Sequence, residues 1–256
     1  MACVLPALLY LAAAVFLIGM AWRTRTWLRT PVPLKIALTP APQSVGGVAV
    51  RLAGELFGFR SLLKADPFLW IPAWLFHVSL VCLFFGHLGG LVIPKLTEGV
   101  LGLSEDQFEH VAQVGGSVIG LLAMLFLLVL LLRRLALERP RWISTFSDYF
   151  ALVLLLLIVI TGNQMRFTSH FDLLQSRRFV AGWLGLHPVA APHELWFTAH
   201  ILLISTLLIY IPFSKLVHAG GATLLSPTLN QMNDPRIRRH INPWDPTPAA
   251  KRPTPP

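Results

Sequence analysis

The sequence predicts an all-α integral membrane protein with five transmembrane helices. Of its 256 residues, 55% are hydrophobic and only 13% are charged, whereas soluble domains carry roughly 25% charged residues. The mean hydropathy of +0.64 agrees with a membrane protein. Apolar runs of about 20 residues, long enough to cross a hydrocarbon core of about 30 Å, mark the spans. They lie near residues 4–22, 69–93, 111–132, 147–165 and 195–217.

Lysine and arginine are distributed unevenly between the predicted loops. Seventeen of the 21 lie in residues 23–68, in residues 133–148 and in the tail from residue 215. Because cytoplasmic loops of membrane proteins are enriched in these residues, we expect the N-terminus outside and the C-terminus in the cytoplasm. The net charge of +9 is therefore a signal of topology, and we expect no nucleic-acid partner.

The first span is predicted to stay in the protein as an anchor. No basic residue precedes it, whereas Arg23, Arg25 and Arg29 follow it, the reverse of the pattern in a cleaved signal peptide. The two cysteines, Cys3 and Cys82, both lie in apolar stretches. They cannot form a four-cysteine iron–sulfur site or a covalent haem attachment, so any iron–sulfur chemistry must belong to a partner.

Two parts of the chain are predicted to have different organisation. Residues 1–218 form the membrane domain, and residues 219–256 form a Pro-rich cytoplasmic tail whose end is extended or disordered. Within the first part, apolar and charged residues alternate at helical spacing over about residues 44–64. This segment is predicted to be an amphipathic helix on the inner membrane surface or against a partner.

Four histidines lie within the predicted spans or at their ends: His77 and His87 in the second span, and His200 and His218 in the fifth. Ionisable groups in a bilayer are costly and usually functional, although any one of these could be a hydrogen-bonded packing residue. The two spans run in opposite directions, so each offers one imidazole toward each membrane face. Two facing pairs at two depths, His77 with His218 and His87 with His200, are what bis-histidine ligation of two stacked haems requires.

The spacing of the histidines differs between the two spans. His77 and His87 are ten residues apart, which is about 15 Å along a helix. His200 and His218 are eighteen apart, which is five full turns and about 27 Å on the same face. Tilted helices and inclined haem planes would have to absorb the difference.

Small and basic residues accompany the histidines. Gly86 and Gly90 flank His87, and further glycines at positions 115, 116 and 120 occur at the start of the third span. They leave room either for a flat macrocycle or for close helix contact. Arg166 and Arg178, on the expected outer side, are candidates for contacts with haem propionates.

Two long segments resemble the di-haem cytochrome b subunit, or gamma subunit, of respiratory nitrate reductase. They are LFHVSLVCLFFGHLGGLVIP and AHILLISTLLIYIPFSKLVH, and the resemblance covers residues 68–218 with the spacing of all four histidines. It implies two haem b groups, with His77 and His218 on the cytoplasmic-side iron and His87 and His200 on the outer-side iron. It also implies quinone as substrate and the bacterial cytoplasmic membrane as the location.

Two further segments are more similar to the DsrM-type membrane cytochrome of the complex that accompanies dissimilatory sulfite reductase. They are FGFRSLLKADPFLW and LLSPTLNQMNDPRIRRHINPWD. This similarity implies electron exchange between menaquinone or ubiquinone and a cytoplasmic iron–sulfur subunit related to heterodisulfide reductase, in dissimilatory sulfur metabolism. It also implies other membrane and periplasmic subunits, with lipid around the spans.

The region before the third span departs from the nitrate reductase pattern. Those subunits carry a lysine where this chain has Gln107. Glu109 and His110 lie nearby and are candidates for proton exchange with quinone. Their alternative role is that of a solvated helix start, because Ser104 and the acidic residues after it favour a helix N-terminus.

The sequence is also compatible with other functions. The chain could be the gamma subunit of a nitrate reductase that passes quinol electrons to an iron–sulfur and molybdenum partner. Intramembrane histidines also occur in proton relays, so a histidine-containing transporter and a haem-free anchor are alternatives of another class. Apart from Asp148 at the edge of the fourth, the predicted spans lack acidic residues, and they show no repeated broken-helix pattern. Both features argue against a transporter.

Overall fold

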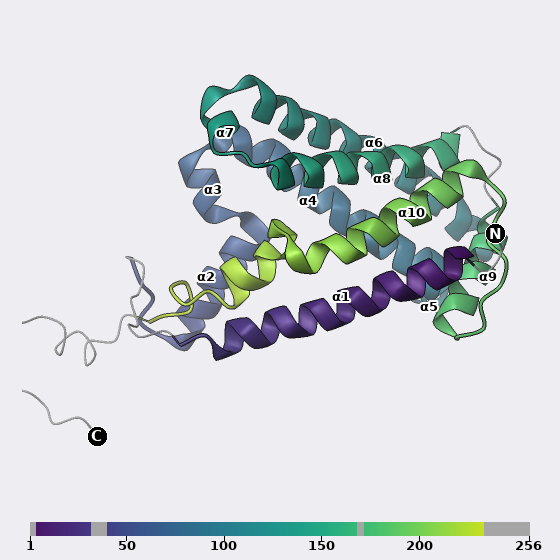
Figure 1. The fold of residues 1–256 in the computed structure, drawn as a ribbon, viewed down its shortest axis with the longest axis horizontal. Coiled ribbons are helices and arrows are strands. Elements are labelled where there is room, and N and C mark those ends of the chain that lie inside the picture. Colours follow the sequence, from purple (N-terminus) through teal and green to yellow (C-terminus); the bar gives the residue numbers. More distant parts are fainter. Residues whose placement is uncertain (1–3, 32–39, 168–171, 233–256) are drawn as a thin grey trace, which may run out of the picture. The chain divides into compact units, whose positions relative to one another are not determined.

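The computed structural model describes residues 4–31, 40–167 and 172–232 (Figure 1). All regular structure in these residues is helical, which confirms the predicted all-α class. Five helices are long and apolar enough to cross a membrane, as predicted. They are Val4–Arg29, Pro67–Val92, Asp106–Ala136, Phe146–Phe167 and Leu195–Phe213.

The chain divides into two compact units. The first comprises Met1–Arg25 and Ser61–Val217, and the second comprises Thr26–Arg60 and His218–Pro256. The spanning helices belong to the first unit, apart from the last turn of the first helix.

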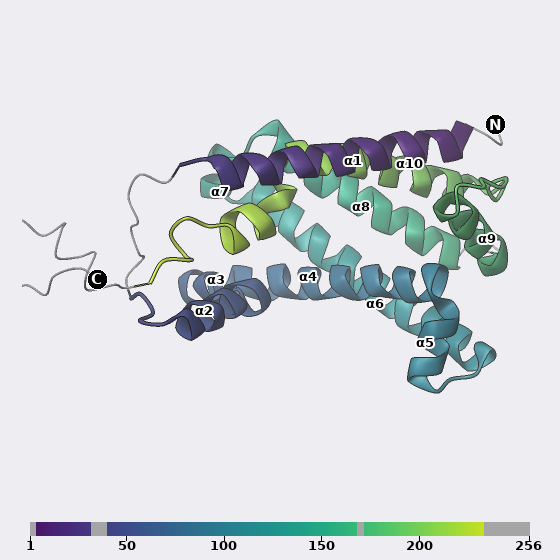
Figure 2. The ribbon, with the colours of Figure 1, turned by 90° about the horizontal axis from the view of Figure 1, so that it is seen from below.

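In the first unit the spanning helices pack as neighbours along the chain. Helix α4 packs on α6, α6 on α8, and α8 on α10. Helix α1 lies along α10, as Figures 1 and 2 show, and a Cβ at Gly19 would come within 2.7 Å of the Pro212 ring there. The helices are α1 (Val4–Arg29), α4 (Pro67–His87), α6 (Glu105–Ala136), α8 (Phe146–Phe167) and α10 (Leu195–Tyr210).

Three short helices in the first unit were treated as loops in the sequence analysis. They are α5 (Pro94–Leu101), α7 (Glu138–Trp142) and α9 (Leu173–Leu184). Helices α5 and α9 lie at one end of the bundle, called here the α9 end, and α7 lies at the other, the α7 end (Figure 1). Each is too short to produce a strong periodic pattern, although Asp172 caps α9 by accepting a hydrogen bond of 2.9 Å from the backbone N–H of Gln175.

Two apolar clusters hold the first unit together. One, around Phe179 of α9 and Phe197 of α10, joins α1, α8, α9 and α10. The other, around Phe76 of α4 and Leu127 of α6, joins α4, α6 and α8. In lipid these clusters stabilise the bundle through close packing rather than through exclusion of water, because lipid tails are as apolar as the side chains.

Polar side chains cap the N-termini of the helices that form the second and third spans. Asp66 caps α4 by accepting a hydrogen bond of 2.9 Å from the backbone N–H of Leu69. Ser104 and Gln107 form a capping box at the start of α6, with each side chain bound to the other's backbone N–H. The helix start predicted at Ser104 is confirmed, and Gln107 has a structural role there.

The fifth span differs from the prediction at its end. Helix α10 stops at Tyr210, and a 3₁₀ turn, η2 (Ile211–Phe213), follows. Ser214 then has extended backbone angles, φ −112° and ψ 177°. Pro212 causes the break, because it has no backbone N–H and its ring opposes a continuing helix. The prediction of five regular turns on one face from His200 to His218 is therefore wrong.

The amphipathic segment predicted at about 44–64 is two helices, not one. Helix α2 (Val45–Gly58) ends at Phe59, whose φ of 48° is left-handed, and α3 (Arg60–Ala65) follows. In the second unit, α2 packs on the π-helical turn η4 (Ala219–Leu224). Within that turn Gly221 lies against the indole of Trp27, where a Cβ would come within 2.8 Å. The Pro-rich end of the predicted tail lies outside the described residues.

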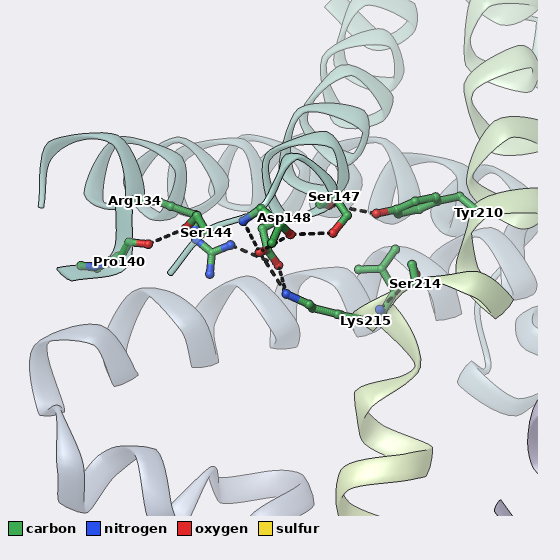
Figure 3. A network of polar contacts seen from close by, with 10 residues as sticks. Arg134, Pro140, Ser144, Ser147, Asp148, Tyr210, Ser214 and Lys215 are labelled. Carbon is green, nitrogen blue, oxygen red and sulfur yellow. Dashed lines mark hydrogen bonds and ion pairs between the residues drawn. The ribbon is translucent and has the colours of Figure 1, made fainter. Parts of the chain in front are cut away.

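A polar network joins the spanning helices at the α7 end (Figure 3). Asp148, whose side chain is 9% exposed, accepts hydrogen bonds of 2.9 and 3.0 Å from Lys215 and lies 3.4 Å from Arg134. The Asp148 carboxylate also accepts bonds of 2.9 Å from the backbone N–H and hydroxyl of Thr145. Tyr210 donates to the backbone carbonyl of Ser147 at 2.9 Å. The network therefore fixes the segment after α10, which includes the 3₁₀ turn η3 (Lys215–Val217), against the start of α8.

Loss of the Asp148 charge should destabilise the first unit. Hydrogen bonds to charged groups contribute about 1.5–3 kcal/mol, and Asp148 is nearly buried. We expect Asp148→Asn to lower the free energy of unfolding by about that amount. Thermal unfolding of the detergent-purified protein measures it.

Asp66→Asn is the matched control for Asp148→Asn. Asp66 pairs with Arg133 at 2.8 Å, but both side chains are about one-third exposed, and an exposed ion pair contributes only about 0–1 kcal/mol. Asparagine also keeps the cap of α4. Equal losses of unfolding free energy in the two variants would contradict the expectation that the more buried carboxylate contributes more to stability.

Candidate functional site

Helix α4 changes its winding directly after His87. Residues Leu88–Val92 form a π-helical turn, η1, closed by a hydrogen bond of 3.0 Å from the backbone N–H of Ile93 to the carbonyl of Leu88. Gly89 and Gly90 lie inside this turn and are buried. Such turns are rare and frequently accompany functional sites, so His87 stands where α4 departs from regular geometry.

The structure brings His87 and His200 together at the α9 end. Their imidazole centroids are 6.4 Å apart and the ring planes differ by only 8°. The two rings come from α4 and α10, which are separated by more than 100 residues of sequence. The predicted association of these two histidines is therefore present in the fold.

Hydrogen bonds at Nδ1 orient two of the histidines on α4. His87 Nδ1 lies 2.7 Å from the carbonyl oxygen of Leu83, and His77 Nδ1 lies 2.7 Å from that of Ala73. A carbonyl can only accept, so in both residues Nδ1 carries the proton. The lone pair of each neutral imidazole is therefore on Nε2.

His200 is oriented by a side chain on a different helix. Its Nδ1 lies 2.9 Å from the hydroxyl oxygen of Thr161, on α8. Thr161 is not among the site residues predicted from the sequence. The available signal was a lone hydroxyl in an apolar run, next to Gly162.

A cavity of about 630 Å³ opens beside His87. Its walls come from α4, η1, α6, α8 and α9, and they include Glu109 and Gln113 of α6 and Arg166 of α8. The His87 side chain is exposed on this cavity. His200 does not line the cavity but adjoins it through Gly162, where a Cβ would lie 3.4 Å from His200 Cε1.

Two kinds of glycine surround this cavity. Gly86 and Gly90 line it, and a Cβ at either position would meet no atom within 4 Å. These glycines therefore leave open space. At Gly116 and Gly120 of α6, by contrast, a Cβ would collide with the Arg166 guanidinium and the Asn163 amide of α8, so these two glycines allow close helix contact.

Arg166 provides a positive charge at the cavity. Its guanidinium donates to the backbone carbonyls of Ala112 and Gln113 at 3.1 and 3.4 Å. These bonds and the space left by Gly116 hold it between α6 and α8. A guanidinium beside a cavity can pair with the carboxylates of a bound ligand. Arg177 of α9 also reaches this region and donates to the carbonyl of Gly90 at 2.9 Å.

The other predicted site residues do not all lie at this cavity. His77 is half-buried on α4 in the first unit, whereas His218 is exposed and begins the second unit. The association of His77 with His218 therefore stays a prediction. Glu109 lines the cavity and His110, its neighbour on α6, does not, although both side chains are exposed.

No group of three or more His, Cys, Asp and Glu side chains converges on a common point in the described residues. A haem iron needs only two axial protein ligands, because the porphyrin supplies the others.

Comparison with known proteins identifies the family. Residues 43–228 match the nitrate reductase gamma subunit family. The chain belongs to this family. It is 36% identical to the Hdr-like menaquinol oxidoreductase cytochrome b-like subunit of Archaeoglobus fulgidus, over 93% of this chain and 82% of that protein. The corresponding subunit of Archaeoglobus profundus is 32% identical, over 94% and 82%.

A second group of relatives carries the nitrate reductase name itself. The nitrate reductase gamma chain of Bacillus subtilis is 32% identical, over 70% of this chain and 86% of that protein. These comparisons confirm the resemblance inferred from the histidine-containing segments. Together with the five long apolar helices, they make this gamma-family member a multi-pass membrane protein.

The contact between α6 and α8 predicts opposite effects for two glycine substitutions. A Cβ at Gly120 collides with Asn163, whereas one at Gly115 meets nothing within 4 Å. Overpacking costs about 1–3 kcal/mol, and replacing a helical glycine by alanine gains up to about 1 kcal/mol. We expect Gly120→Ala to lower the thermal unfolding temperature and Gly115→Ala to leave it unchanged or raise it. A fall of equal size in both variants would contradict the packing inferred at Gly120.

Proposed function

We propose that this chain is a membrane di-haem cytochrome b subunit that exchanges electrons between the quinone pool and a cytoplasmic iron–sulfur partner related to heterodisulfide reductase. The parallel pair His87 and His200, with centroids 6.4 Å apart, carries the proposal. A family match over residues 43–228 supports it independently.

His87 and His200 would hold one haem iron between them. Their ring centroids are 6.4 Å apart, and a metal bound at about 2 Å by one nitrogen of each imidazole would need a separation of this order. His87 has its lone pair on Nε2, the nitrogen that would bind iron, because Nδ1 donates to Leu83. The distance between the two ring centroids would therefore change little on binding a metal.

The surroundings of the pair also fit a haem. Gly86 and Gly90 leave the wall of the cavity without side chains, so a flat macrocycle can approach the backbone. Arg166 would pair with a propionate, because its guanidinium is held at the same cavity.

His77 and His218 are the proposed ligands of the second haem. The Nδ1 bond of His77 to Ala73 leaves Nε2 with a lone pair, as in His87.

The bound haems supply reversible one-electron transfer across the membrane. The residues of the chain supply proton exchange for the quinone and the positions of the ligands. Glu109 is the proposed proton-exchanging group, because its carboxylate lies at the cavity wall, and His110 is a second candidate one residue away. By the distribution of Lys and Arg, we place the α9 end outside and the C-terminal segment in the cytoplasm.

The relatives bear on the choice of partner and quinone. The Archaeoglobus proteins are named as Hdr-like menaquinol oxidoreductase subunits and have the higher coverage of this chain, which favours a heterodisulfide-reductase-like partner and menaquinone. A role in dissimilatory sulfur metabolism in a bacterial cytoplasmic membrane is part of this proposal. The Bacillus subtilis relative supports the second candidate, a nitrate reductase gamma subunit with an iron–sulfur and molybdenum partner.

Co-purification distinguishes the two candidate complexes. The tagged chain is isolated from its native membrane in mild detergent, and the subunits retained with it are identified. An iron–sulfur protein without molybdenum supports the heterodisulfide-reductase-like partner. Recovery of a molybdenum enzyme would establish the second candidate in its place.

Removal of one ligand of the pair should remove one haem. We expect His87→Ala and His200→Ala each to reduce the haem content from two to one per chain, because a single axial imidazole does not retain the haem. Extracted haem counted per polypeptide, together with reduced-minus-oxidised absorption spectra, measures this loss.

His187→Gln is the control for the ligand variants, because His187 is exposed in a loop. It should retain both haems. A wild-type chain purified without haem would overturn the proposed function and leave a transporter or a haem-free anchor as the alternatives. Two haems in both ligand variants would overturn the assignment of the pair.

Neutralisation of Glu109 should slow quinone turnover without loss of haem. General acid–base groups contribute about 10²–10⁴-fold to rates, so we expect Glu109→Gln to lower quinol oxidation by about 10²-fold. Asp106→Asn, an exposed acid one turn earlier on α6 that does not line the cavity, is the control. Stopped-flow reduction of the purified chain by a menaquinol analogue measures the rates, and equal rates in all three proteins would exclude Glu109 as the proton-exchanging group.

A further inference from the structure

We propose that Thr161 is a positioning residue for the haem iron bound between His87 and His200. Its hydroxyl fixes the orientation and tautomer of His200 and strengthens that imidazole as a ligand. This inference rests on the proposed function and adds to it a side chain outside the histidine pair.

The Thr161 hydroxyl is held rigidly in place. The residue is 6% exposed, and its Oγ1 lies 3.0 Å from the carbonyl oxygen of Leu157 and 2.9 Å from that of Ile158, in the preceding turn of α8. A threonine hydroxyl has one proton, which these carbonyls accept. The lone pairs of Oγ1 remain available to a donor.

His200 Nδ1 lies 2.9 Å from this oxygen. When Nε2 binds a metal, the imidazole proton must be on Nδ1, so His200 donates and Thr161 accepts. Every polar atom of this contact is then satisfied within the protein. The Thr161 hydroxyl is fixed by its own helix, and its contact with Nδ1 in turn holds the His200 ring parallel to the His87 ring.

His200 differs in this respect from His87 and His77. Their Nδ1 atoms face carbonyls of their own helix, Leu83 and Ala73, which no side-chain substitution removes. His200 has a side-chain acceptor on another helix, the Thr161 hydroxyl, beside the backbone carbonyl of Ile158. The strength of the side-chain part depends on the residue at position 161. Gly162, next to it, leaves room for the ring to approach α8 closely.

The hydrogen bond has an electronic consequence. An acceptor at Nδ1 raises the basicity of Nε2, and a more basic ligand stabilises the oxidised iron, which has the higher positive charge. Loss of the acceptor should therefore raise the reduction potential of this haem. A tenfold loss of preference for the oxidised form corresponds to about 59 mV for a one-electron couple.

Thr161→Val and Thr161→Ser test the inference in the full chain. Valine keeps the shape of threonine and removes the acceptor, whereas serine keeps the hydroxyl. Thr206→Val is the matched control, because Thr206 also bonds to its own helix, with Oγ1 2.9 Å from the carbonyl of Leu202, but is exposed. Optical redox titration gives the potentials of the haems, and the low-spin EPR signals report the ligand orientation.

We expect Thr161→Val to raise the potential of one haem and leave that of the other unchanged. Thr161→Ser and Thr206→Val should match the wild type. If Thr161→Val retains too little haem for titration, then loss of one haem in it and in Thr161→Ala, with retention in Thr161→Ser, supports the same role, since orienting partners contribute about 10–100-fold to metal affinity.

Two results would overturn the inference. One is wild-type potentials, EPR signals and haem content in Thr161→Val. The other is an equal change in Thr161→Val and Thr161→Ser, which would assign the effect to packing. A wild-type chain without haem is a different outcome, because it contradicts the proposed function itself.

Discussion

The need to satisfy every polar group inside the protein constrains this structure more than any other factor. Lipid offers no hydrogen-bond partners, so polar groups in a spanning segment must find them within the bundle. His87 donates to a carbonyl of α4, His200 to Thr161, and the Asn163 amide faces Met124 at 3.9 Å. The positions of the helices follow from these contacts as much as from apolar packing.

The glycines allow polar side chains to be placed between helices. Gly116 and Gly120 let α6 and α8 approach, so that Arg166 and Asn163 fit between them. Gly86 and Gly90 instead leave space unfilled at the cavity. The same residue type thus serves two purposes, and the difference is whether a neighbouring helix occupies the space.

The two ends of the bundle have different construction. The α7 end is closed by charge, with Asp148, Arg134 and Lys215 in one network (Figure 3). The α9 end is open at a cavity and surrounded by short helices, and only there does α4 change to π-helical winding. The α7 end is thus held by ion pairs, whereas the α9 end keeps a cavity lined by both polar and apolar residues.

The sequence by itself determined the class and the five spans, and it singled out His87 and His200 as a candidate pair, because hydropathy over 20 residues and an ionisable group in lipid are local signals. It also located the start of α6 at Ser104. Only the tertiary structure decided that the fifth span stops at Tyr210, that the 44–64 segment breaks at Phe59, and that Thr161 orients His200. These features depend on which atoms from distant segments lie within about 3 Å of each other, and no periodicity in a single segment contains that information.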